Sequence, residues 1–395
     1  DQIVVNGDVT VNGADLNLID GFNPADGDRF TLIQNNGVNP VSGEFVGYPE
    51  GHVFTNFLGS GLNAYLTYLG GDGNDVVIHM VDSTPEITVP NNGAADQYTL
   101  EIVGGNFVLS ETVSGTIIST FPVAAINGPL VIHGEDGQND TLTIDLDTID
   151  HTTDIQIEFR GGTGGNDELI LERTGAVNSV GHVFTSASDG SIFLDGESQA
   201  TITYTGLEPI DDQIVATDRT FSFTAAADET ITLSNYVTVG ETLIDSTLGE
   251  SVNFVNPTGT VTIYTENALV IPIGDGADTI NIEGVDAGFT ANLTVIAGTN
   301  DTVTFLTNPT NVGTGNLDIT AGSIALNAAI TTSGNVSMNA TNGSISGTSL
   351  VTATNADLRA TGDVGASGTE VELAVDSLEA NVTGSLYVDN TGAIN

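Results

Sequence analysis

The sequence predicts an all-β protein, a parallel β-helix or β-solenoid whose first three quarters remain open to sandwich-like segments. Stretches in which apolar residues alternate with polar ones follow one another along the 395 residues, and no stretch has the period of an amphipathic helix. The 48 glycines and 11 prolines lie largely at the breaks between these stretches. Many short strands without helices are typical of sandwiches, barrels and solenoids.

A turn rich in Gly, Asp and Asn recurs five times, and each copy closes on an aspartate. The copies are GGDGNDVVI (70–78), GEDGQNDTLTIDL (134–146), GGTGGNDELILE (161–172), GDGADTINIE (274–283) and AGTNDTVTF (297–305). The second residue after the aspartate is always apolar: Val77, Leu142, Leu169, Ile280 and Val303. The fourth is apolar in all copies but the first: Ile144, Leu171, Ile282 and Phe305. Because side chains alternate between the two faces of a strand, each turn is predicted to begin a half-buried strand.

Four segments follow one another along the chain. Residues 1–80 form a β-repeat that ends in GGDGNDVVI, and residues 81–210 and 211–310 form β-repeats with two Gly-Asp turns each. Residues 311–395 are almost all Gly, Ala, Ser, Thr, Asn and small aliphatic residues, and their most helix-like stretch, 369–380, alternates as VELAV and SLEANV. A sandwich needs large side chains to fill a gap of about 10 Å between sheets. The last segment therefore favours stacked coils, whereas the Phe and Tyr residues of the earlier segments leave sandwich-like packing open.

Charge excludes several classes of partner. The chain has 52 acidic residues, five arginines, no lysine and no cysteine, which gives a net charge of -47. Its mean hydropathy is slightly positive, so we expect a folded chain with its acids outside. Such a field repels nucleic acids and anionic lipid and attracts cations. No apolar run approaches the roughly 20 residues that span a bilayer, so no membrane span is predicted. Because the chain begins without methionine and ends within a repeat, we expect a processed or partial segment of a longer protein.

Catalysis is not expected. Without lysine and cysteine there is no Schiff base, Walker-type phosphate site, Lys-Asn isopeptide bond or thiol nucleophile. No GxSxG or HExxH motif occurs, and we expect the histidines at turns or on strand surfaces; they are His52, His79, His133, His151 and His182. The arginines are too few and too scattered for a lyase of acidic sugars; they are Arg29, Arg160, Arg173, Arg219 and Arg359. A β-helical glycosidase is the weakest alternative, since two carboxylates suffice for it.

Several phrases resemble repeats of very large secreted proteins. The stretch FTLIQNNGVNPVSGEFVGYPEG to YLTYLGGDGNDVVI is similar to a repeat of giant surface proteins of planctomycetes and related aquatic bacteria, a type related to autotransporter-associated β-strand repeats. ITYTGLEPI and ESVNFVNPTGTVTIYT are similar to other segments of such proteins, and residues 311–395 resemble the β-helical repeats of filamentous haemagglutinin-type adhesins. The resemblance implies an exported surface or fibre protein built as a β-solenoid.

The Gly-Asp turns also resemble the hemolysin-type calcium nonapeptide GGxGxDxUx. In that repeat, glycines permit the turn and oxygens of neighbouring turns converge on a hard cation. The residues that would bind structural Ca²⁺ here are Asp72, Asn74, Asp75, Asp136, Asn139, Asp140, Asn166, Asp167, Asp275, Asp278, Asn300 and Asp301. The copies are not in tandem, but Asp140 and Asp167 are 27 residues apart and Asp278 and Asp301 are 23 apart, about one coil each. The alternative is an ordinary Asx turn, in which the carboxylate binds nearby backbone and no metal is needed.

We therefore expect an extracellular, structural or adhesive β-solenoid segment of a large bacterial surface protein that forms or contributes to a fibre or cell-surface layer. The alternative is a calcium-stabilised, carbohydrate-binding adhesin module. The expected partners are copies of the chain, end to end or laterally, and a cell-surface or extracellular polysaccharide.

Overall fold

The computed structural model describes residues 2–19, 21–83, 85–149, 155–197, 199–224, 227–265, 276–392 and 394. The chain forms two compact units: unit 1 is Asp1–Glu172 with Thr201–Leu207, and unit 2 is Arg173–Ala200 with Glu208–Asn395. The all-β prediction is confirmed, since the helical segments in the described ranges are the short 3₁₀ turns Phe57–Gly59 and Val123–Ala125. Within those ranges, no helix is both long and apolar enough to cross a membrane.

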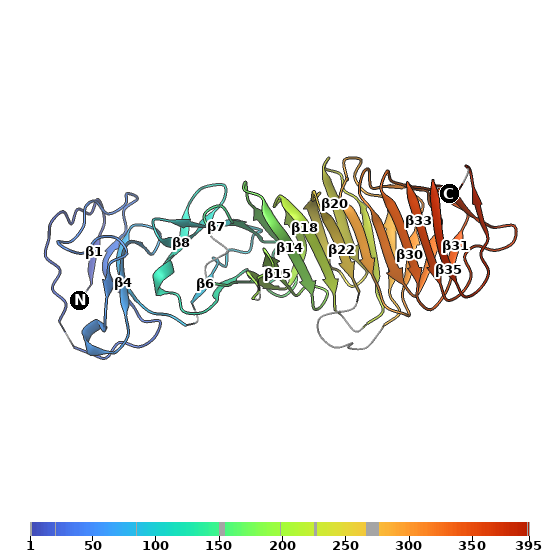
Figure 1. Cartoon of the computed structure of the whole chain (residues 1–395). Helices are drawn as coiled ribbons and strands as arrows, with labels where there is room; N and C mark the ends of the chain where they lie inside the picture. The colour runs from blue at the N-terminus through green and yellow to red at the C-terminus, as the bar shows by residue number, and fades with distance from the viewer. Residues whose placement is uncertain are drawn as a thin grey trace. The chain divides into compact units, whose positions relative to one another are not determined.

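The first part of unit 1 is a mixed sheet in the order β1-β2-β5-β4-β3 (Figure 1). Its strands are β1 (Ile3–Val5), β2 (Arg29–Asn35), β3 (Val53–Phe54), β4 (Ala64–Gly70) and β5 (Asp75–Met80). Only β1 and β2 pair in parallel among these strands. Phe57, Leu66 and Ile78 are among the buried side chains beneath it.

The rest of unit 1 contains two further groups of paired strands. One is the parallel series β6 (Glu86–Thr88), β10 (Leu130–His133), β12 (Ile157–Arg160) and β16 (Ile202–Thr205). The other joins the antiparallel strands β9 (Ile117–Pro122), β8 (Asn106–Glu111) and β7 (Gln97–Val103) to the parallel strands β11 (Thr141–Asp145) and β13 (Asp167–Glu172).

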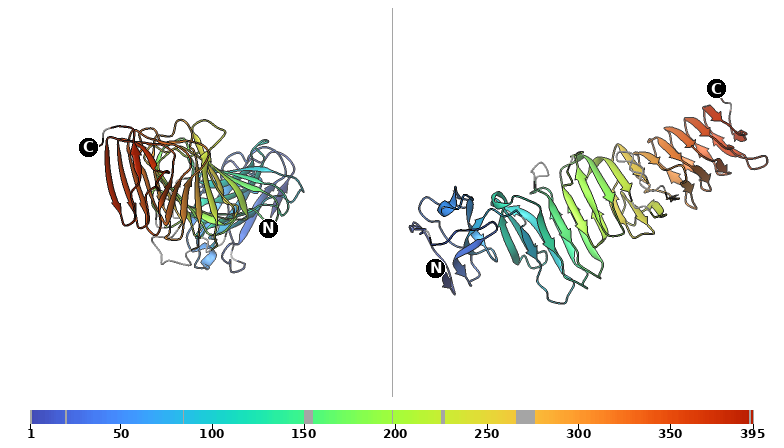
Figure 2. Two further views of the ribbon diagram at one scale, coloured as in Figure 1. Left: turned by 90° about the vertical axis from the view of Figure 1, so that its right-hand side faces the viewer. Right: turned by 90° about the horizontal axis from the view of Figure 1, so that it is seen from below.

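Unit 2 is dominated by parallel pairing, and Figures 1 and 2 show its strands stacked side by side. One series is β15 (Gly190–Leu194), β14 (Val177–Phe184), β18 (Ala216–Phe223), β22 (Thr260–Tyr264), β24 (Asn292–Ile296), β27 (Leu317–Ala321), β30 (Asn335–Ala340), β33 (Asn355–Ala360) and β35 (Ser377–Val382). A second is β17 (Leu207–Asp212), β21 (Ser251–Val255), β20 (Glu241–Ser246), β19 (Thr230–Asn235), β23 (Thr279–Glu283), β25 (Thr302–Phe305), β28 (Ser323–Leu326) and β31 (Ile345–Gly347). A third is β26 (Thr310–Asn311), β29 (Ile330–Thr331), β32 (Val351–Thr352), β34 (Val371–Ala374) and β36 (Val388–Asn390). Most of residues 369–380 thus lie in β34 and β35, as their alternation predicts.

The core of unit 2 consists of columns of inward residues, because neighbouring strands keep the same register. Leu293, Leu317, Val336 and Ala356 are direct partners on β24, β27, β30 and β33, and all four are buried. Inward columns of this kind require only small and medium side chains, which is what the last segment supplies.

The expectation that each Gly-Asp turn begins a half-buried strand is confirmed for β11, β13, β23 and β25. It is wrong for β5, which is buried on both faces from Val76 to Met80 because Phe121 packs on the His79 side. Strands β5, β11, β13, β23 and β25 begin at the closing aspartate or directly after it. The apolar residues two and four positions after the aspartates are all buried; they are Val77, Leu142, Leu169, Ile280, Val303, Ile144, Leu171, Ile282 and Phe305.

Candidate functional site

The first Gly-Asp turn joins the antiparallel strands β4 and β5. Asp75 accepts a hydrogen bond from the backbone N–H of Asn35 at 2.7 Å, and the Asn74 side chain donates to the Gly37 carbonyl at 2.6 Å. Burial raises the pKa of Asp75, the Asn35 bond opposes this, and nearby Asp72 adds to the rise. Asp72 itself is exposed. This turn therefore connects to the neighbouring strand β2 rather than to another Gly-Asp turn.

The structure brings the turns of Asp140 and Asp167 side by side in unit 1. Strands β11 and β13 pair with Thr141 opposite Glu168, and the Asp140 N–H donates to Asp167 Oδ1 at 2.8 Å. Gly165, at φ +122°, approaches so closely that a Cβ would lie 1.9 Å from the Gln138 carbonyl oxygen. Only glycine can occupy this position.

Further bonds join the same two turns. Asn166 N–H donates to Asn139 Oδ1 at 3.0 Å, and Thr163 donates to Asp136 Oδ1 from both its backbone N–H and its hydroxyl. Asp140 accepts from the backbone N–H of Asp96 with one carboxylate oxygen and from that of Glu135 with the other. Burial raises the pKa of Asp167 to about 6, its bond with the Asp140 N–H opposes the rise, and the Asp140 charge adds to it.

The turns of Asp278 and Asp301 are joined in the same way in unit 2. Asp278 N–H donates to Asp301 Oδ1 at 2.9 Å, and the Glu229 N–H donates to Asp278 Oδ1 at 2.9 Å. Asp301 Oδ2 accepts from the Gly298 N–H and the Thr265 hydroxyl. Asn300 is exposed, and Asp275 lies outside the described residues. Aspartates of neighbouring strands thus form a ladder of carboxylate-to-amide bonds.

The turn carboxylates of the described residues do not converge as a cation site requires. In the described part of the chain, no group of three Asp, Glu or His side chains is placed to hold a metal ion. The oxygens named above accept N–H and O–H groups, and a carboxylate accepting two or three such bonds is satisfied without a metal. The Asx-turn alternative accounts for these bonds, and the calcium hypothesis stays a prediction.

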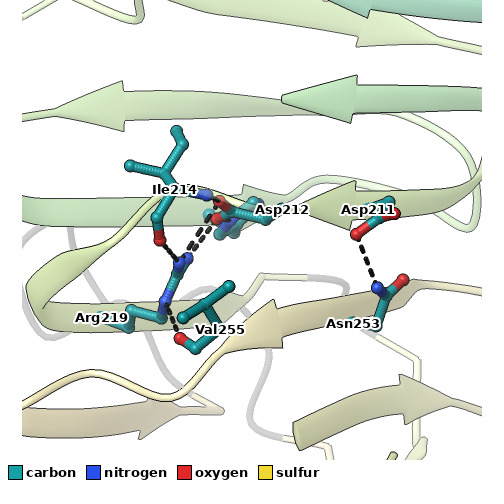
Figure 3. A network of polar contacts seen from close by, with 7 residues as sticks. Asp211, Asp212, Ile214, Arg219, Asn253 and Val255 are labelled. Carbon is teal, nitrogen blue, oxygen red and sulfur yellow. Dashed lines mark hydrogen bonds and ion pairs between the residues drawn. The ribbon is translucent and has the colours of Figure 1, made fainter. Parts of the chain in front are cut away.

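A second polar cluster, which sequence reasoning missed, lies fully buried in unit 2 (Figure 3). The Arg219 guanidinium donates to both carboxylate oxygens of Asp212 and to the Ile214 carbonyl, and its Nε donates to the Val255 carbonyl at 3.0 Å. The Nε2 of His182 lies 2.9 Å from Asp212 Oδ2, and all three polar side chains are 0% exposed. We call Arg219, Asp212 and His182 the buried triad.

Electrostatics favour an ionised Asp212. Burial alone would raise its pKa, but the Arg219 charge and the bonds to His182 and Arg219 outweigh burial and lower the pKa to about 2. The His182 ring stacks on Phe221, with centroids 5.3 Å apart, and the Arg219 guanidinium lies over the Phe254 ring. With no exposed atom, the triad has no access to a substrate, so its role is to fasten β14, β17 and β18 together.

The position of His182 corrects the expectation that the histidines lie at turns or strand surfaces, and His79 is buried as well. A signal for the triad is present in the sequence. His182 alternates in step with Val180 and Phe184, and Arg219 in step with Phe221 and Phe223, so both positions face the core. The apolar neighbours thus predict inward polar groups, which must be paired when buried.

No protein-family model, curated protein or solved structure matches this chain.

Proposed function

We propose that the chain is an extracellular β-solenoid segment of a large bacterial surface protein, with a structural or adhesive role in a fibre or cell-surface layer and without catalysis. The support is one series of strands in unit 2, in which each strand pairs in parallel with the next and the inward residues are matched. The series is β18, β22, β24, β27, β30, β33 and β35. A stack held by nearest-neighbour pairing extends by adding strands at its end.

Strand β35 supports association between copies, because its inward residues are not covered by another strand. Leu378, Ala380 and Val382 pair with Ala356, Leu358 and Ala360 of β33, which are buried, yet none of the three is itself buried. The edge has no proline and no lysine, the residues that commonly block edge pairing. A further strand with the same alternation would cover this column, and we propose that a second copy of the chain supplies it.

End-to-end association is the test. We expect sedimentation velocity and electron microscopy of the whole chain to show coaxial oligomers that grow with protein concentration. Ala380→Lys, which places a charge on the uncovered column, should abolish them. Asn381→Lys is the matched control, since it adds the same charge on the adjacent, outward position of the same strand. A wild-type chain that stays monomeric at its highest soluble concentration, or equal assembly by both variants, would contradict the proposal.

A further inference from the structure

A groove of about 310 Å³ lies in unit 1 where β6, β10 and β12 end, and its lining includes Thr88, His133 and Arg160. These three residues are direct partners, because His133 is opposite Thr88 on one side and Arg160 on the other. Neighbouring strands are about 4.8 Å apart, so the three side chains form one row across the sheet. The groove volume is at the lower end of the range of about 300–1,000 Å³ for small-molecule sites.

The row offers hydrogen-bond donors. The Nε2 of His133 is screened from solvent and lies 3.7 Å from Glu86 Oε2, so it is not available to a ligand and Arg160 is the donor of this row. Arg160 uses its Nε to bind Glu158 at 2.6 Å, and 42% of its side chain is exposed. Its two terminal amino groups have no acceptor among the residues that the structure describes, so they are available to a ligand.

Acceptors line the other side of the groove. Glu135 binds the backbone N–H groups of Asn92 and Gly93, which fixes the turn. Asp136 uses Oδ1 for Thr163, and no described donor binds its Oδ2. The Thr163 bonds also lower the pKa of Asp136, so the group is an ionised acceptor.

Charge selects the class of ligand. Glu86, Glu135, Asp136 and Glu158 lie in or beside the groove against a single guanidinium, in a chain of net charge -47, so an anionic ligand is repelled. A cationic ligand would leave the Arg160 donors unpaired. A hydroxyl group both donates and accepts, so a neutral polyol can satisfy both sides of the groove.

We propose that this groove binds a neutral saccharide, with Arg160 donating to its hydroxyl oxygens and Asp136 accepting from a hydroxyl group. The site lies wholly within unit 1 and does not depend on assembly through β35, so it goes beyond the structural role proposed above. Each proposal can fail without the other.

Saturation-transfer NMR and calorimetry on the whole chain test this site. The probes are cellotetraose, maltotetraose, mannotetraose and galactotetraose as neutral saccharides, an oligomer of glucuronate as the anion, and spermidine as the cation. We expect at least one neutral saccharide to bind, and Arg160→Gln to weaken that binding by about tenfold or more, the loss typical of one or two hydrogen bonds.

Arg359→Gln is the matched control. Like Arg160, Arg359 is an outward arginine on a parallel strand bound to the acid two residues earlier, Asp357, but it lines no part of the groove. This variant should bind the saccharide as the wild type does, and thermal unfolding should show both variants folded. Binding of spermidine or glucuronate alone, no binding of any neutral probe, or binding unchanged in Arg160→Gln would each overturn the proposal.

Discussion

Each unit buries a histidine, but the two histidines differ in whether they have a hydrogen-bond partner. In unit 1, His79 lies 3% exposed between strands of a mixed sheet, and neither ring nitrogen has a hydrogen-bond partner in the described residues. In unit 2, His182 is fully buried but binds Asp212, which is paired with Arg219. Arg219 is opposite Val180 and His182 is opposite Phe221, and both side chains reach Asp212 on β17, so the buried charge meets its partner. No described residue offers the buried His79 imidazole such a partner, and it is left neutral and unpaired.

Breaking the buried triad should have the largest effect. Arg219→Met leaves the Asp212 carboxylate without its charged partner, and removal of one member of a buried ion pair costs about 3–5 kcal/mol. We expect urea unfolding followed by circular dichroism to show this loss, and hydrogen exchange to locate it in β14, β17 and β18 while unit 1 keeps its protection. His182→Phe retains the aromatic stack and the Arg219–Asp212 pair, so it should cost less. Equal losses in both variants would show that pairing is not what stabilises this site.

The difference between the units also explains how far the sequence predicts the molecule. Alternation and turn chemistry predicted the all-β class and the buried residues after each Gly-Asp turn, because both depend on local geometry. The pairing of Asp140 with Asp167 depended on coil length, and the 27-residue spacing indicated it. The meeting of His182, Asp212 and Arg219 depends on the register of strands far apart in the chain. Their inward positions could be read from Phe184, Phe221 and Ile214, but their contact could not.

Acid should weaken unit 1 through His79. Burial, helped by the nearby Arg29 charge, lowers the pKa of His79 to about 3. An unfolded histidine takes up a proton below about pH 6.5. Between these values the unfolded chain binds more protons, so the His79 contribution is present above pH 6.5 and is lost as the pH falls toward 3. By pH 4 the stability lost through His79 amounts to ~3 kcal/mol.

Replacement of this histidine isolates that effect from the titration of the carboxylates. We expect His79→Leu to lose less stability than the wild type between pH 7.5 and pH 4, measured by urea unfolding and by hydrogen exchange in β5. His133→Gln, on the outer face of β10, should follow the wild-type pH dependence. A wild type and His79→Leu with parallel pH profiles would rule out His79 as the source of acid sensitivity.

The stability of unit 2 should instead fall as the pH rises, because of Glu229. Burial, with the charges of Glu250 and Asp278, raises its pKa to about 7 against the opposing bond of Ser246. The folded state therefore binds the extra proton between the unfolded value, near 4.3, and pH 7, and its stability falls as the pH rises through this range. Glu229→Gln removes the buried charge and should stabilise unit 2 by ~2 kcal/mol at pH 8 but far less at pH 4. Glu379→Gln, at an exposed position, is the control, and a gain that is equal at both pH values would contradict the titration of Glu229.

Removal of divalent cations should have the smallest effect in either unit. Because the carboxylates of Asp140 and Asp301 already accept backbone N–H groups, EDTA should leave the unfolding midpoint unchanged. Millimolar Ca²⁺ and Mg²⁺ should raise it slightly and equally, by screening the acidic surface. Asp140→Asn should lower stability by about 1–2 kcal/mol in EDTA, since it weakens charge-assisted bonds that need no metal. A rise seen with Ca²⁺ but not Mg²⁺, and lost in Asp140→Asn, would instead mean that the turns of unit 1 rearrange around an ion and that the ladder is their metal-free form.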